Sequence, residues 1–115
     1  MNEQKTTKLL ALLGLARRAG QLAVGFSAVE QLVRRPGNTL VVAATDMGAS
    51  QKSKVNRFEN LSGLVDDVLT GQQMAEAFGR DKLVIVGLSD PGFIKGIKKL
   101  IGEVDPSAGK PSSAD

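Results

Sequence analysis

The sequence predicts an α/β layer sandwich, in which a small sheet is covered by helices on both faces. Segments with the 3.6-residue periodicity of amphipathic helices alternate with short apolar runs, and this alternation is typical of α/β proteins. Two runs, TLVVAAT at residues 39–45 and KLVIVGL at residues 82–88, lack the polar–apolar alternation of a half-exposed strand, which indicates strands covered on both faces. The chain of 115 residues is long enough for one hydrophobic core. We therefore predict one domain over residues 1–104 and a disordered tail over residues 105–115, where Ser, Pro and Gly predominate.

The first half of the chain is predicted to form helix, strand, helix and strand. A helix over residues 8–19 ends at Gly20 and has one apolar side, formed by Leu9, Leu12, Leu13 and Ala16. Residues 21–24 are long enough only for a short strand. A second helix over residues 27–35 begins with Ser27 and Glu30 at the spacing of a capping box. The run at residues 39–45 then forms a central parallel strand.

The second half continues the alternation. Residues 49–60 are expected to form a polar helix with Val55 and Phe58 facing inward and with Lys52, Lys54 and Arg57 as a solvated face. Residues 63–69 form an edge strand that contains the acidic pair Asp66-Asp67. Thr70 caps a short helix through Phe78. After the strand at 82–88, Ser89 or Asp90 opens a last helix with Pro91 in its first turn, and its inner side is formed by Ile94, Ile97, Ile101 and Val104.

The composition excludes several classes of function. The chain has no histidine and no cysteine, which removes the commonest general base, the thiol nucleophile and the usual zinc ligands. It has no dinucleotide-binding or P-loop glycine motif, and no cofactor is expected. Asp46, at the end of a buried strand, could bind Mg²⁺ together with Asp66, Asp67 and Asp90, but an aspartate that ends a strand at a turn is far commoner. A small enzyme centred on Asp46 is therefore the third hypothesis.

Location follows from the apolar pattern. No run of about 18 apolar residues is present, so no transmembrane helix is expected, and the first ten residues lack a signal-peptide core. We predict a cytoplasmic protein without membrane contact.

The distribution of charge indicates a nucleic-acid partner. Residues 1–38 contain six basic and two acidic groups, 6 − 2 = +4, whereas residues 39–115 contain nine basic and ten acidic groups, 9 − 10 = −1. Gly25 suits a positive φ just before a helix whose free N–H groups favour phosphate. Four Phe without Tyr or Trp argue against a base-stacking platform and favour structured RNA held by backbone and shape. Phe26 is either a wedge against an RNA base or a hydrophobic staple for the helix.

Three blocks of the sequence resemble a known family. They are LLGLARRAGQLAVGFSAVEQLVRR, LVVAATDMGAS and LTGQQMAEAFGRDKLVIVGLSDPGFIKGIKKLI, and the likeness covers Thr7 to Gly102. The blocks resemble the bacterial branch, including the YlxQ type, of the ribosomal protein superfamily (the L-seven-Ae and L-thirty-e group) that binds kink-turn RNA. The resemblance implies a three-layer α-β-α sandwich with a small mixed sheet and RNA binding, with ribosomal RNA or ribosome assembly as the setting.

The resemblance also implies a set of contact residues. The superfamily signature Gly-x-Asn-Glu-x-x-Lys falls on Gly25, with Ser27, Ala28 and Gln31 replacing its Asn, Glu and Lys. These departures leave kink-turn specificity open. A second contact region of the superfamily falls on residues 78–82. The candidate RNA-binding residues are Arg17, Arg18, Gln21, Gly25, Phe26, Ser27, Ala28, Gln31, Arg34, Arg80 and Lys82.

Our leading hypothesis is a non-catalytic, monomeric protein that binds structured RNA, ribosomal or kink-turn-like, and is associated with the ribosome. The ribosome or its assembly proteins are further candidate partners. The alternative is a protein-interaction module on the same fold that has lost kink-turn binding. A continuous positive surface joining Arg17, Arg34 and Arg80 would favour RNA, and scattered arginines would favour the alternative.

Overall fold

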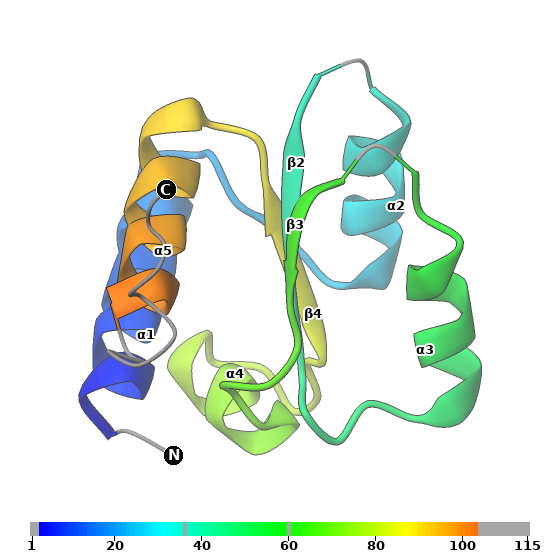
Figure 1. Cartoon of the computed structure of the whole chain (residues 1–115). Coiled ribbons are helices and arrows are strands. Elements are labelled where there is room, and N and C mark those ends of the chain that lie inside the picture. Colours follow the sequence, from blue (N-terminus) through cyan, green and yellow to red (C-terminus); the bar gives the residue numbers. More distant parts are fainter. Residues whose placement is uncertain (1–2, 36, 60, 104–115) are drawn as a thin grey trace.

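A sheet lies between two layers of helices in the computed structural model, which describes residues 3–35, 37–59 and 61–103 (Figure 1). Helices α1 (Glu3–Arg18), α4 (Gly71–Ala77) and α5 (Pro91–Glu103) cover one face. Helices α2 (Phe26–Arg34) and α3 (Ala49–Asn56) cover the other. The predicted α/β sandwich is confirmed. The predicted tail, residues 105–115, and the predicted inward residue Val104 lie outside the described residues.

The sheet is mixed, as the resemblance implied. Its strands are β1 (Ala23–Val24), β2 (Thr39–Ala43), β3 (Leu61–Val65) and β4 (Ile85–Leu88), in the order β1-β4-β2-β3. The two runs without alternation, β2 and β4, are the central strands, as predicted. However, β2 is parallel only to β3 and is antiparallel to β4. The short helix α4 lies at the carboxyl end of β2 (Figure 1), so the chain enters β4 from that end and runs the opposite way.

The two faces of the sheet explain the missing alternation. Leu40 and Val42 of β2 point into the larger core under α1, α4 and α5, whereas Val41 and Ala43 point into a smaller core under α2 and α3. All of β2 is buried. A strand covered on both faces needs apolar side chains at successive positions. Within the described ranges, no helix combines the length and the apolar character that crossing a membrane requires.

The caps of the helices are partly as predicted. Thr70 caps α4 with a capping box, in which its hydroxyl accepts from the Gln73 N–H and the Gln73 side chain accepts from the Thr70 N–H. Asp90, one of the two predicted openers of α5, accepts from the N–H groups of Gly92 and Phe93 at 2.8 and 3.1 Å. Helix α1 begins at Glu3, five residues before the predicted start. It ends as predicted at Gly20, which has φ 74°.

Three predictions about the ends of helices and strands are wrong. The acidic pair Asp66-Asp67 lies after β3, exposed in a bend, because an unpaired carboxylate is costly to bury. The capping box of Ser27 and Glu30 does not form, since Gly25 is the N-cap of α2 and no side chain caps the helix. Ser27 instead lies exposed inside the first turn. Helix α3 is also shorter than predicted, so that Phe58 follows the helix, half-buried against the smaller core.

Candidate functional site

The start of α2 is fixed by the backbone of Gly25. Its φ of 95° and ψ of 161° belong to a region that other residues rarely adopt. The Gly25 N–H donates to the Ile85 carbonyl of β4 at 3.0 Å, and the Gly25 carbonyl accepts from the Val29 N–H at 3.0 Å. The N–H groups of Phe26, Ser27 and Ala28, in the first turn, have no intrahelical acceptor and no side-chain cap. They form a small donor surface with the positive end of the helix dipole behind it.

Arg80 lies beside this donor surface. A Cβ placed on Gly25 would lie 4.0 Å from Nη1 of Arg80, and no other heavy atom outside its chain neighbours lies nearer. The side chain of Arg80 is exposed and makes no hydrogen bond or ion pair with the described residues. The turn at Gly79, with φ 66°, ends α4 and directs the chain to this position: the Arg80 N–H donates to the Ala75 carbonyl at 2.8 Å.

Arg17 is attached to the same turn from the other side. Its Nη1 donates to the Phe78 carbonyl at 3.1 Å, and its guanidinium carbon lies 5.5 Å from the centre of the Phe78 ring. Arg17 thus connects the end of α1 to the end of α4, with Arg80 two residues beyond Phe78. We call the group formed by Gly25, Arg80 and the free N–H groups of residues 26–28 the α2 amino-end site, and Arg17 holds the turn that precedes Arg80.

The signature positions lie on a neighbouring part of α2. Ala28 and Gln31 line a hollow of about 270 Å³ together with Gln21 and Arg35. The predicted candidates Gln21, Ala28 and Gln31 are therefore brought together on one surface between α2 and the segment that follows α1. In this hollow, Ala28 and Gln31 stand where the superfamily signature has Glu and Lys.

Arg34 lies apart from Arg17 and Arg80. It is at the far end of α2, about 12 Å along the helix axis from the first residue. The three arginines therefore do not form one compact patch, and this arrangement by itself favours the protein-interaction alternative. Lys54 connects the two regions, because its Nζ lies 5.5 Å from the centre of the Phe26 ring, directly beyond Gly25.

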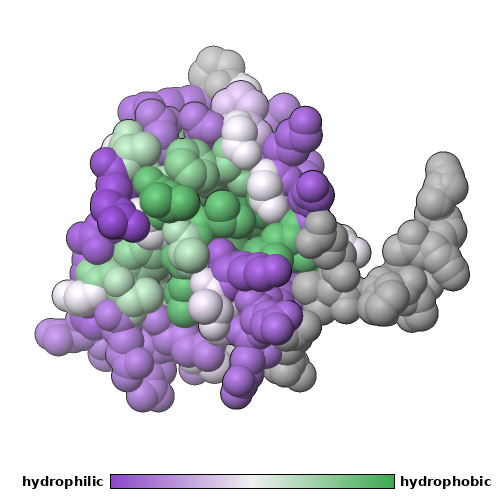
Figure 2. Space-filling view, turned by 90° about the vertical axis from the view of Figure 1, so that its left-hand side faces the viewer, coloured by the Kyte–Doolittle hydropathy of each residue, from purple (hydrophilic) through white to green (hydrophobic). Residues whose placement is uncertain are grey.

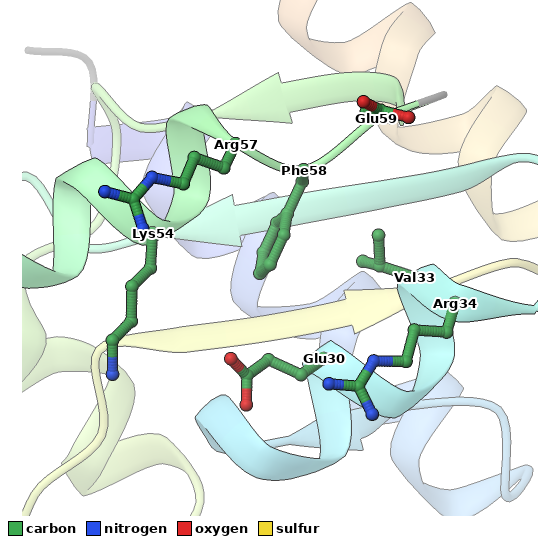
Figure 3. A pocket seen from close by; sticks show the side chains of 7 residues that line it. All are labelled: Glu30, Val33, Arg34, Lys54, Arg57, Phe58 and Glu59. Atoms are coloured by element: carbon green, nitrogen blue, oxygen red, sulfur yellow. The ribbon is translucent and has the colours of Figure 1, made fainter.

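A groove between α2 and α3 surrounds Arg34. We call it the α2–α3 groove; it is lined by Glu30, Val33, Arg34, Lys54, Arg57, Phe58 and Glu59 (Figure 3). The predictions included Arg34 but treated Lys54 and Arg57 as an ordinary solvated face. Phe26 borders this region, with its ring centre 6.1 Å from that of Phe58 at an angle of 50°. As the first residue of the helix, Phe26 cannot be the staple, which precedes the cap.

The remaining candidate residues belong neither to the α2 amino-end site nor to the α2–α3 groove. The side chains of Arg18 and Lys82 are exposed and form no hydrogen bond or ion pair with the residues the structure describes. The side chain of Asp46 is hydrogen-bonded to the backbone. Its Oδ1 accepts from the Gly71 N–H at 2.9 Å and connects the loop after β2 to the start of α4. In the described part of the chain, no three His, Cys, Asp or Glu side chains gather as a metal site. The magnesium hypothesis thus has no geometric support in this region.

Comparisons with known proteins agree with the fold and with the resemblance. No protein-family model matches the chain. A solved structure, described as a protein with unknown function from Bacillus halodurans, has 35% sequence identity and a TM-score of 0.71, covering 84% of this chain and 98% of that one. A protein from Enterococcus faecium, named RNA-binding protein YlxQ, is 29% identical over 102 residues, which are 88% of this chain and 98% of the relative. Both matches are nearly full-length for the related protein, and over most of its length the chain is similar to a YlxQ-type protein, as its sequence blocks indicated.

Proposed function

We propose that the chain is a non-catalytic RNA-binding protein and that the α2 amino-end site holds a backbone phosphate of the RNA. The main observation is that Arg80 lies beside Gly25, at 4.0 Å from the position of a Cβ. This puts a guanidinium that has no hydrogen-bond or ion-pair partner among the described residues next to the uncapped N–H groups of a helix start. Backbone donors and an arginine fork together match the oxygens of a phosphate. The name of the Enterococcus faecium relative supports the same function.

Gly25 is suited to this role for two reasons. Its backbone conformation lets the chain leave the sheet edge at β1 and enter α2 within one residue. Its missing side chain leaves the donor surface open to a phosphate. Residues 26–28 then present their N–H groups directly to the ligand.

Specific recognition of kink-turn RNA depends on the side chains at the signature positions of α2. A guanine edge presents N–H donors, and the Ala28 side chain cannot accept a hydrogen bond. Gln31 is neutral where the superfamily signature has a cation. We therefore propose that the protein binds structured RNA mainly through its backbone and that its kink-turn affinity is lower than that of a protein with the full signature.

A triple variant tests this proposal. The change Ser27→Asn, Ala28→Glu and Gln31→Lys restores the signature on residues that are exposed or half-buried, so the core stays intact. It adds one acid and one base, and the net charge is unchanged. Kink-turn affinity should rise at least about tenfold, equivalent to about 1.4 kcal/mol, whereas affinity for a plain RNA duplex should stay nearly constant. Fluorescence anisotropy titrations of both RNAs with both proteins measure this. Tight nanomolar binding of the kink-turn by the wild type would contradict it.

Ribosome association through a protein surface is the second candidate function. Figure 2 shows a patch of hydrophobic residues on the face formed by α1 and α5, and Leu15 of α1 is 49% exposed. An apolar patch surrounded by polar residues is typical of a protein contact. In sucrose gradients with ribosomes, Leu15→Glu should lower co-sedimentation without changing affinity for isolated RNA. If only Arg80→Ala lowers it, RNA contacts account for the association.

A further inference from the structure

We propose that the α2–α3 groove binds one nucleotide, with the base against Phe58 and the phosphate held by the cations that line the groove. The nucleotide is an unpaired residue of the bound RNA or a free mononucleotide, which has the same chemistry. The first case rests on the proposed function, and the second does not. The groove lies on the α3 side of α2, beyond the α2 amino-end site and away from the signature positions Ala28 and Gln31.

The size of the groove fits a nucleotide. Its volume is about 560 Å³, within the range of about 300–1,000 Å³ that is usual for small-molecule sites. Figure 3 shows that side chains from two elements face it: Glu30 and Arg34 extend from α2, whereas Lys54 and Arg57 extend from α3 and the residue after it. Because both elements pack on the same face of the sheet, the spacing between the two sets of side chains is fixed by the core beneath them.

Phe58 supplies an aromatic surface at the back of the groove. The side chain is half-buried against the smaller core, so the ring is held in place while lining the groove. Phe26 does not stack flat on it, since the two rings meet at 50° with their centres 6.1 Å apart. An aromatic ring that is fixed and only partly covered is the usual platform for a nucleic-acid base.

The charges of the groove select a ligand with both anionic and donor groups. Arg34, Lys54 and Arg57 are exposed, and among the described residues they form no ion pair with Glu30, Glu59 or any other carboxylate. The three cations attract a phosphate. The two carboxylates reduce the charge of the groove to 3 − 2 = +1, and they accept hydrogen bonds from ribose hydroxyls and from the amino groups of bases. A nucleotide carries all of these groups.

The groove also continues from the α2 amino-end site. Phe26 directly follows Gly25 and touches Phe58, and Lys54 lies over the Phe26 ring. An RNA strand whose phosphate is held at Gly25 and Arg80 therefore meets a positive charge and then an aromatic ring on the way to Arg34. An unpaired nucleotide of the same strand, beyond the held phosphate, would enter the groove.

Amide NMR of the full chain tests the proposal directly. The ¹⁵N-labelled protein is titrated in separate experiments with GMP, AMP, inorganic phosphate and a structured RNA that contains an unpaired nucleotide. Shifts at the amides of Glu30, Arg34, Arg57 and Phe58 with a mononucleotide or with the RNA support the proposal. Shifts with inorganic phosphate that equal those with the mononucleotides, or an absence of shifts in the groove with every ligand, overturn it. If the RNA shifts only Gly25–Ala28 and Arg80, RNA binding stands and the groove proposal fails.

Two variants and a matched control give an independent readout. Phe58→Leu keeps an apolar side chain against the core, and Arg57→Gln removes one exposed charge. Phe58→Leu should weaken binding of the ligand that shifts the groove by about five- to a hundredfold, the range expected for one base stack. Lys52→Gln, which makes the same charge change on α3 outside the groove, should leave binding unchanged. If Phe58→Leu unfolds, Arg57→Gln decides the question. Equal losses from Arg57→Gln and Lys52→Gln would show general charge attraction and overturn the site.

Discussion

At the scale of single residues, Gly25 sets the position of α2 through its backbone. Its φ of 95° costs a residue with a Cβ about 1–3 kcal/mol, even though the space beside it is open except for the Arg80 guanidinium. The sequence indicated a glycine with positive φ before a helix. It could not show that the glycine is itself the cap, because Ser27 two residues later offered a better-known cap.

Gly25→Ala should therefore lower the free energy of unfolding by about 1–3 kcal/mol. Gly14→Ala is the matched control, since Gly14 lies inside α1 with no heavy atom within 4 Å of an added Cβ. That change should raise the free energy of unfolding by about 0.5–1 kcal/mol, as Ala is the better helix former. Urea denaturation of both variants measures the difference. Equal effects of the two changes would show that the conformation of Gly25 carries no strain for Ala.

Arg17 and Arg18 are adjacent arginines with different surroundings. Arg17 donates to the Phe78 carbonyl and lies over the Phe78 ring, whereas Arg18 is exposed and without such contacts among the described residues. Arg17→Ala should lower the free energy of unfolding by about 1 kcal/mol, and Arg18→Ala should change it by less than about 0.5 kcal/mol. Thermal and urea unfolding of the two variants test this. A larger loss for Arg18→Ala would contradict the contacts assigned to Arg17.

At the scale of elements, the caps distinguish α4 from α2. Helix α4 has a capping box at Thr70, whereas α2 starts without any side-chain cap. Thr70→Ala should lower the free energy of unfolding by about 1 kcal/mol. Ser27→Ala should change it by less than about 0.5 kcal/mol, since Ser27 is exposed inside the first turn. Urea denaturation compares the two. A loss near 1 kcal/mol for Ser27→Ala would indicate that Ser27 caps α2 in the capping box that the sequence predicted.

An uncapped start of α2 also has a functional meaning. A side chain that capped the helix would occupy the N–H groups that we assign to phosphate. The Thr70 cap has no such consequence, because the N–H groups of Gly71 and Gln73 at the start of α4 donate to Asp46 and Thr70 within the protein. The helix start that is capped by a side chain, that of α4, and the helix start whose N–H groups are left for a ligand, that of α2, thus belong to different helices.

At the scale of the whole molecule, alternation of helices and apolar runs was enough to predict the layers. The two strands without alternation, β2 and β4, were placed correctly in the centre because burial on both faces leaves a clear mark on the sequence. The antiparallel direction of β4 was missed, since it depends on where α4 returns the chain and no local pattern records that.

The site was harder to predict than the fold. Arg80 and Gly25 are 55 positions apart, 80 − 25 = 55, and the turn at Gly79 brings Arg80 to the start of α2. Composition argued against base stacking because the chain has only four Phe. The fold nevertheless brings Phe26 of α2 and Phe58, which follows α3, together beside three cations. Scarcity of a residue type along a sequence does not limit its local concentration in space.

The charge of the molecule also gains meaning only in the fold. The excess of positive charge in residues 1–38 suggested nucleic acid, but Arg80, Lys54 and Arg57 come from the other part of the chain. The positive side chains of Arg80, Lys54 and Arg34 therefore come from both parts of the chain.

The salt dependence of RNA binding tests the central proposal most directly. Each phosphate neutralised should contribute about 0.7 to 0.9 to the slope of log affinity against log salt, so three to five contacts give a slope between roughly −2 and −4. Anisotropy titrations with a structured RNA over about 50 to 300 mM salt measure this slope. Arg80→Ala should make it shallower by about one unit, whereas Lys95→Ala, on the exposed side of α5, should leave it unchanged. A flat slope for the wild type, or equal changes for Arg80→Ala and Lys95→Ala, would contradict RNA binding at the α2 amino-end site.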